Sequence, residues 1–217
     1  MPTHITDKGY HQGRVPANKG KTYPAEILTP DEVNSLIRAC SNRAPTGIRN
    51  RALMVVLYRG GLRSNEALAL LPKDVDLEAG TITVLHGKGD RRRTVGLDPV
   101  ATSVIARWGD TRKGLSIDGR RRLLCTLSGG PLKASYVRTL LPRLAKRAGI
   151  EKRVHPHGLR HSLAFEMVME GVPVTIIQQV LGHSSLATTE RYLSHLAPKA
   201  SIEAMQQRDW KTEPAIG

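Results

Sequence analysis

The chain has 217 residues and carries 33 Lys and Arg against 19 Asp and Glu, a formal net charge of +14. This length can bury a sizeable core, and so strong a positive charge indicates a polyanionic partner, with nucleic acid favoured over a membrane surface. The longest wholly apolar run, residues 52–58, is too short to span a bilayer, and residues 1–26 contain no secretory signal, so a cytoplasmic protein with no membrane partner is expected.

The cysteines and aromatic residues narrow the class of partner. Cys40 and Cys125 are too isolated for a disulfide framework or a zinc ribbon, which fits a reducing compartment. Aromatic residues make up 4% of the chain, so base stacking on exposed rings is not the expected means of binding. Double-stranded DNA held by its phosphates is therefore favoured over a single strand.

Residues 1–27 are expected to form a basic, flexible arm, because they contain almost no large apolar side chain that could be buried. Two interpretations of these residues are open: an arm that contacts DNA, and a disordered tail or expression remnant. Beyond the arm, Thr29 followed by Pro30 and Glu32 has the pattern of a capping box with proline at the first helical position. This pattern predicts a helix over residues 30–40.

A second helix is predicted over residues 48–59, stopped by Gly60 and Gly61. Ser64 is expected to cap a short third helix that ends at Pro72.

Two charged residues lie at the start of that third helix. Arg63 comes just before the expected cap, and Glu66 follows within the first turn, where the helix dipole favours a carboxylate. Glu66 is therefore placed to hold or orient a neighbouring cation.

The hydrophobic period then changes to two over residues 81–85 and 93–97, which predicts a β-hairpin. The connecting Gly-Lys-Gly-Asp sequence is typical of a turn, so Lys88 is expected at the hairpin tip. Taken singly, such a lysine is ordinarily a solubilising charge.

The rest of the chain is expected to be mainly helical. Residues 109–122 are predicted to form a basic loop facing DNA, residues 123–127 a short strand, and Pro142 a kink in its helix. Helices are predicted over residues 98–108, 133–148, 157–170, 173–181, 185–192 and 200–207. The predicted class is α+β, mostly α-helical, with a small antiparallel sheet or hairpin.

The side chains best suited to chemistry gather in residues 155–192. On a helix that begins near Pro156, His157, Arg160 and His161 have the spacing i, i+3 and i+4 and share one cationic face. Such a face suits a phosphate, because arginine presents a planar fork to its oxygens and imidazole can donate or accept a proton. The carboxylates of this stretch are spread along it, so a pair of catalytic metal ions is not expected.

Two other interpretations of this stretch are open. The same spacing occurs on ordinary salt-bridged helix surfaces. Four histidines also offer a possible zinc site without a Cys or Asp beside them, namely His155, His157, His161 and His183.

Taken together, five motifs resemble the catalytic domain of the tyrosine recombinase (phage integrase) family, over about residues 28–207. They are GLRSNE at 61–66, GKGDRRR at 87–93, HGLRHS at 157–162, LGHSS at 181–185 and RY at 191–192. Each motif is weak alone, and their common order and spacing make the resemblance specific. It implies a catalytic domain over 28–195, followed by a segment over 196–217. This segment is either exchanged between subunits or packed against its own domain.

The resemblance also implies a role for individual residues. Tyr192 resembles the nucleophile, and a phenol with an unperturbed pKa of about 10 needs surrounding cations and a proton acceptor to attack at neutral pH. By resemblance the catalytic residues are Arg63, Lys88, His157, Arg160, His183 and Tyr192, with Glu66 and His161 in support. The two arginines and His183 would stabilise the phosphate, Lys88 would protonate the leaving 5′ oxygen, and His157 would assist proton transfer. No metal or other cofactor is implied.

The implied activity is site-specific recombination of duplex DNA, as in the integrases of mobile elements, through a 3′-phosphotyrosyl intermediate and as a tetramer on DNA. Family members commonly carry a further N-terminal helical domain that closes around DNA, and here about 27 polar residues precede the catalytic part. DNA selectivity is then expected to be weak, or to rest on the arm and the loop over 109–122. Two alternatives are a binding-only DNA regulator on the same fold and an enzyme like a type IB topoisomerase.

Overall fold

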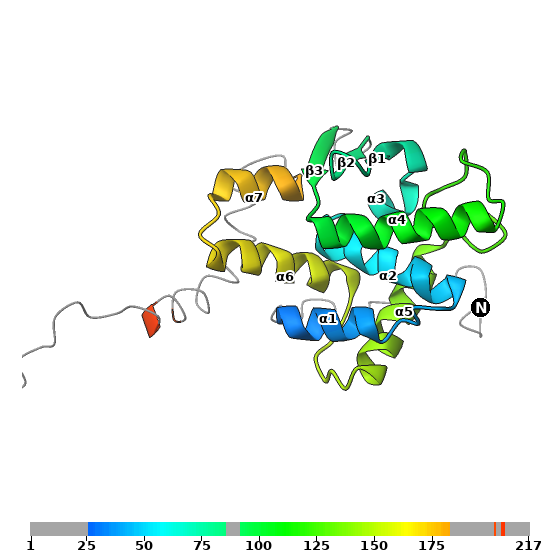
Figure 1. The fold of residues 1–217 in the computed structure, drawn as a ribbon. Helices are drawn as coiled ribbons and strands as arrows, with labels where there is room; N and C mark the ends of the chain where they lie inside the picture. The colour runs from blue at the N-terminus through cyan, green and yellow to red at the C-terminus, as the bar shows by residue number, and fades with distance from the viewer. Residues whose placement is uncertain (1–25, 86–91, 183–201, 203–204, 207–217) are drawn as a thin grey trace, which may run out of the picture.

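The structure is a computed structural model that describes residues 26–85, 92–182, 202, 205 and 206. Its elements confirm the predicted α+β class, with many helices and one small antiparallel sheet (Figure 1). None of the helices in these residues is long and apolar enough to cross a membrane. In chain order the elements are α1 (Pro30–Arg38), α2 (Pro45–Tyr58), α3 (Ser64–Ala69), a 3-10 helix (Pro72–Asp74), β1 (Val75–Asp76), β2 (Thr81–Val84), β3 (Arg93–Gly96), α4 (Pro99–Gly114), α5 (Ala134–Arg147), α6 (Pro156–Met169) and α7 (Val174–Leu181).

The start of α1 confirms the predicted capping box. The Thr29 hydroxyl accepts from the Glu32 backbone N–H at 3.2 Å, and the Glu32 carboxylate accepts from the Thr29 N–H at 2.7 Å. Two N–H groups at the start of the helix are thereby satisfied. The last residues of the predicted arm are also bonded to the domain, since the Glu26 carboxylate accepts from the Arg153 N–H at 2.6 Å.

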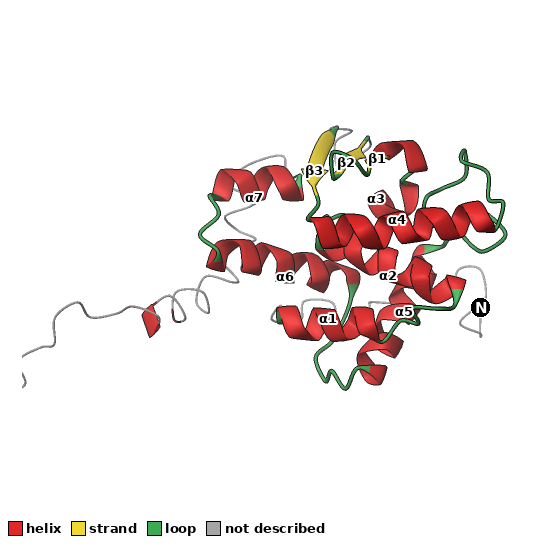
Figure 2. Cartoon of the chain, in the orientation of Figure 1, coloured by secondary structure: helices red, strands yellow, loops and turns green. Residues whose placement is uncertain are grey.

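The core is organised around α2, whose residues from Ala52 to Tyr58 are all buried. A helix that is apolar on all sides needs neighbours on all sides, and α2 contacts α1, α3, α4 and α6 (Figure 2). It begins at Pro45, earlier than predicted, because proline suits the first helical position. By contacting both α3 and α6, α2 places the two elements that carry the candidate site.

The sheet confirms the predicted hairpin. Strands β2 and β3 are antiparallel, with Ile82 opposite Val95 and Val84 opposite Arg93. A third strand, β1, was missed, because two residues are too few to show a period of two. Lys88 lies outside the described residues, so its place at the hairpin tip stays a prediction.

Two predictions in the middle of the chain were wrong. Helix α4 continues to Gly114, so the first part of the predicted loop over 109–122 is helical. Its last turn is held by Arg112, which is buried at 5% exposed and donates to loop carbonyls at 3.2 to 3.3 Å, those of Asp118, Arg121 and Arg122. Residues 123–127 form one isolated bridge, Cys125 to Pro131, and no strand. The apolar character of Leu123, Leu124 and Cys125 reflects their burial in the core.

The last described helices lie close to their predicted positions. His155 caps α6, since its Nδ1 accepts from the Gly158 N–H at 3.0 Å. Helix α7 ends at Gly182, which is left-handed at φ 60°. Helix α5 includes Pro142, as expected, and the kink there stays a prediction. The helices predicted over 185–192 and 200–207 lie outside the described residues, apart from helical positions at 202, 205 and 206.

Candidate active site

A pocket of about 720 Å³ lies where α3, α5 and the start of α6 meet. Glu66 is the one carboxylate among its described lining residues. The cationic and imidazole side chains that line it are Arg63, Arg138, Arg153, Arg160, His155 and His157. The fold therefore brings four of the predicted site residues together from two distant parts of the chain, and surrounds them with positive charge.

Arg63 forms the N-cap of α3, one position before the predicted cap at Ser64. Its backbone N–H donates to the Glu66 carboxylate at 2.9 Å, and its Nη1 donates to the same carboxylate at 2.8 Å. One carboxylate thus holds both the main chain and the guanidinium of Arg63. The Arg63 side chain remains 26% exposed and can meet a ligand in the pocket.

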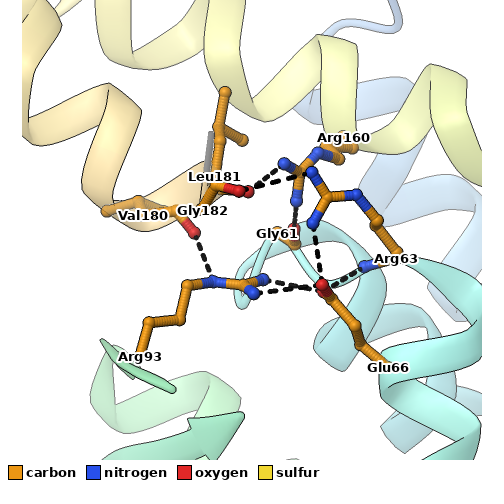
Figure 3. A network of polar contacts seen from close by, with 8 residues as sticks. All are labelled: Gly61, Arg63, Glu66, Arg93, Arg160, Val180, Leu181 and Gly182. Carbon is orange, nitrogen blue, oxygen red and sulfur yellow. Dashed lines mark hydrogen bonds and ion pairs between the residues drawn. The ribbon is translucent and has the colours of Figure 1, made fainter. Parts of the chain in front are cut away.

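Glu66 also binds Arg93, which comes from the start of β3. Arg93 donates to the Glu66 carboxylate through Nη1 at 3.1 Å and Nη2 at 2.7 Å (Figure 3). The Glu66 side chain is only 4% exposed, and this burial alone would raise its pKa. The hydrogen bonds from Arg93 and from the Arg63 backbone outweigh burial and lower the pKa of Glu66 to about 2. Glu66 is therefore ionised at neutral pH.

No separate role was predicted for Arg93, because it is the last of three consecutive arginines after a turn. A run of charge in that place is usually solvated. The period of two in β3 could have predicted that Arg93 points inward, since Arg93 and the buried Val95 lie on the same face of this strand.

Three consecutive carbonyls at the end of α7 each accept a hydrogen bond from a different arginine (Figure 3). The last carbonyls of a helix have no partner within it, and cations near them also complement the helix dipole. The pairs are Arg93 Nε to Val180 at 3.2 Å, Arg160 Nη2 to Leu181, and Arg63 Nη2 to Gly182 at 3.4 Å. The end of α7 is thereby fixed against both predicted catalytic arginines.

Arg160 is 1% exposed and lines the inner part of the pocket. Its Nη1 donates to the Gly61 carbonyl and its Nη2 to the Leu181 carbonyl. Backbone carbonyls orient a guanidinium without cancelling its charge. Because Arg160 is buried, its positive charge acts more strongly on neighbouring groups than it would in water.

His157 lines the pocket near the two predicted catalytic arginines. Its pKa is lowered, first by desolvation of the imidazole and then by the positive charges of Arg160, His155 and Arg63. The imidazole is then neutral at neutral pH and can accept a proton. His161 packs edge-on against it, with ring centroids 4.7 Å apart, and its supporting role stays a prediction.

His155 has a structural role that was not predicted. Its Nδ1 accepts the capping hydrogen bond of α6, which requires that nitrogen to be unprotonated. Burial, followed by the charge of Arg153, lowers the pKa of His155 and favours that state. No group of three metal-ligating side chains occurs among the described residues, and His183, the fourth histidine of the zinc alternative, lies outside them.

Three predicted catalytic residues lie outside the described part of the chain: Lys88, His183 and Tyr192. Their roles stay predictions. His183 directly follows Gly182, whose carbonyl accepts from Arg63.

Comparisons with known proteins agree with this fold. The XerA recombinase structure has a TM-score of 0.74 and 31% identity, over 91% of this chain and 70% of that one. The XerH site-specific recombinase, solved in a post-cleavage complex with its palindromic difH substrate, has a TM-score of 0.69 and 30% identity, over 85% of this chain and 54% of that one.

The curated relatives are longer than this chain. Tyrosine recombinase XerC of Halalkalibacterium halodurans is 34% identical over 180 residues, which are 80% of this chain and 59% of the relative. The chain thus spans less than two thirds of such relatives. The model of the phage integrase family matches residues 26–198, which is most of the sequence, and the chain belongs to that family.

Proposed function

We propose that this chain is a site-specific tyrosine recombinase, which cleaves and rejoins duplex DNA through a covalent 3′-phosphotyrosyl link. The observation that carries the proposal is the pocket that Arg63, His157 and Arg160 line together. Glu66, the one carboxylate among the described lining residues, is already paired with two arginines, so the net charge of the pocket favours an anion.

The two arginines provide electrostatic stabilisation of a phosphate. Attack on a phosphodiester places extra negative charge on its non-bridging oxygens, and guanidinium groups that are already oriented stabilise this charge with little reorganisation. Arg63 is oriented by Glu66, and Arg160 by the Gly61 and Leu181 carbonyls. His183 would add a further donor on the same phosphate.

The covalent step transfers the DNA phosphoryl group from the 5′ oxygen to the Tyr192 oxygen. The Tyr192 oxygen forms a bond to phosphorus as His157 accepts the phenolic proton, and the bond from phosphorus to the 5′ oxygen breaks. The departing 5′ oxygen keeps the electron pair and takes a proton from Lys88. One phosphodiester replaces another, so attack by a second 5′ hydroxyl reverses the step and rejoins DNA without ATP.

Double-stranded DNA is the proposed partner. XerH, a relative with the same fold, is solved on its DNA substrate, which supports this choice. The pocket is also lined by Arg138 and Arg153, which are exposed, and no ion pair within residues 26–85 and 92–182 engages either guanidinium. We assign both to phosphates beside the scissile one. A tetramer that exchanges residues 196–217 is proposed on the family resemblance.

The test is covalent trapping on nicked suicide duplexes drawn from a random library. We expect the wild-type protein to form an adduct in the presence of EDTA, and Tyr192→Phe to bind duplex equally but form none. An adduct that persists in Tyr192→Phe would refute the assignment of the nucleophile. Binding without any wild-type adduct would favour a binding-only regulator, and relaxation of a plasmid without a target site by a monomer would favour a topoisomerase.

A further inference from the structure

Arg93 joins three separate elements through one side chain. It belongs to β3, its Nη1 and Nη2 donate to Glu66 on α3, and its Nε donates to the Val180 carbonyl on α7 (Figure 3). All three guanidinium nitrogens are engaged, and the side chain is 10% exposed. A planar fork with fixed donor directions is needed to meet a carboxylate and a carbonyl at once, and lysine offers only a point charge.

The glycine that ends α7 leaves space for the Arg93 side chain. A Cβ atom at Gly182 would lie 2.8 Å from Cδ of Arg93 and 2.9 Å from its Nε and Nη1. Gly182 is also left-handed, a conformation that favours glycine. Arg93 therefore packs closely against the end of α7, whereas a surface ion pair requires no such fit.

We propose that Arg93 is a positioning residue of the active site, which holds the Glu66 carboxylate so that Arg63 faces the pocket and locks the end of α7 against the same carboxylate. This inference rests on the proposed function, because Arg63 is assigned there to the phosphate. Arg93 itself is directed to Glu66 and Val180, and it acts through Arg63.

The charge balance at Glu66 explains why the position of Arg63 depends on Arg93. The carboxylate is almost fully buried, and it accepts from Arg63 and Arg93 on both oxygens. Without Arg93, a buried carboxylate either draws its remaining cation fully onto itself or takes up a proton. The first outcome withdraws the Arg63 guanidinium from a phosphate, and the second removes the group that orients it.

Hydrogen exchange tests the positioning directly and needs no catalysis. We expect Arg93→Lys to speed amide exchange by about tenfold or more in peptides spanning residues 62–67 and 178–182, since a weakened charged contact frees these segments locally. Peptides from α2 should stay protected. Unchanged exchange in both segments, or an equal rise throughout α2, would overturn the proposal.

Arg59→Lys is the matched control. Arg59 also bridges two carboxylates, Asp98 at 2.8 Å and Glu166 at 3.0 Å, and it is not among the residues that line the pocket. We expect Arg59→Lys to leave exchange in residues 62–67 and 178–182 unchanged. If it alters these segments as Arg93→Lys does, the effect is general loss of stability and the proposal is overturned.

Single-turnover cleavage supplies a second readout. Arg93→Lys should slow adduct formation by about tenfold or more while duplex affinity changes by less than about threefold, because positioning acts on the reacting geometry more than on binding. Cleavage at the wild-type rate would overturn the proposal. If the wild-type protein forms no adduct, the proposed function fails, and hydrogen exchange still decides the role of Arg93.

The pH profile separates positioning from a purely structural role. Arg63 and Arg93 contact the Glu66 carboxylate. The other charged or titratable groups that line the pocket with it are Arg138, Arg153, Arg160, His155 and His157. In Arg93→Gln the buried Glu66 loses one cation, which raises its pKa, so we expect the acid-side loss of cleavage to begin at a higher pH than in the wild type. A profile identical to that of the wild type would count against Arg93 acting through Glu66.

Discussion

Glu66 binds Arg63 twice, through the backbone N–H at 2.9 Å and through Nη1 at 2.8 Å. The same carboxylate therefore starts α3 and sets the direction of the guanidinium. Ordinary helix capping satisfies backbone donors only. Here capping and side-chain orientation depend on one group, so a change at Glu66 should affect both.

Glu66→Gln should slow DNA cleavage by about tenfold to a hundredfold, because a neutral amide orients two guanidinium groups less strongly than a carboxylate does. Duplex affinity should be unchanged or slightly higher, since one negative charge is removed. Single-turnover adduct formation and fluorescence anisotropy measure the two effects. Glu78→Gln, on an exposed turn, is the control, and an equal loss of affinity and rate in Glu66→Gln would contradict this prediction.

Stability towards acid should depend on Glu66. Its pKa is lowered from 4.5 to about 2 in the folded protein, so its ionised form contributes stability above pH 4.5 that is lost as the pH falls towards 2. Urea unfolding at pH 7, 4.5 and about 3 measures this loss. Glu66→Gln is expected to be less stable at pH 7 and to lose less free energy of unfolding on acidification. Parallel curves for the two proteins would contradict the assignment.

His157 should set the acid limb of the cleavage reaction. Since burial and neighbouring positive charges lower its pKa, the limb should lie below the usual imidazole value of about 6.5. His157→Gln should reduce the single-turnover rate by about a hundredfold and remove the limb, because amide groups do not accept protons in this range. An acid limb that persists unchanged in His157→Gln would assign it to another group.

Gly182→Ala should disturb the site more than its backbone strain alone explains. The new methyl group would collide with the Arg93 side chain, so we expect cleavage to fall strongly while duplex binding is retained. Gly171→Ala is the control, because Gly171 has a similar positive φ of 74° and a methyl group added there would meet nothing within 4 Å. Equal losses of cleavage in the two variants would show that strain, and not the collision, is responsible.

Arg138 and Arg153 should contribute to affinity through phosphate contacts. Arg138→Gln and Arg153→Gln should each weaken duplex binding for all sequences and reduce the slope of log affinity against log salt by about 0.9. Arg143→Gln is the control on the same helix, since Arg143 does not line the pocket and its Nε donates to the Thr139 carbonyl. A normal salt slope in the two pocket variants would remove them from the DNA interface.

Local patterns in the sequence predicted local structure well. The Thr29 capping box, the antiparallel hairpin and the shared face of His157 and Arg160 each depend on residues a few positions apart. The predicted end of α4 was wrong because Arg112 is held by carbonyls of the loop that follows, and a helical period does not reveal such contacts. The role of Arg93 was missed for the same reason, since its partners lie far away in the chain.

The last turn of α7 connects the three arginines of the site to one another. Three neighbouring peptide groups of this turn each accept from one of Arg63, Arg93 and Arg160, so one short stretch of backbone is shared by the three guanidinium groups. A displacement of this one helix end would therefore remove a hydrogen bond from each of the three arginines at once.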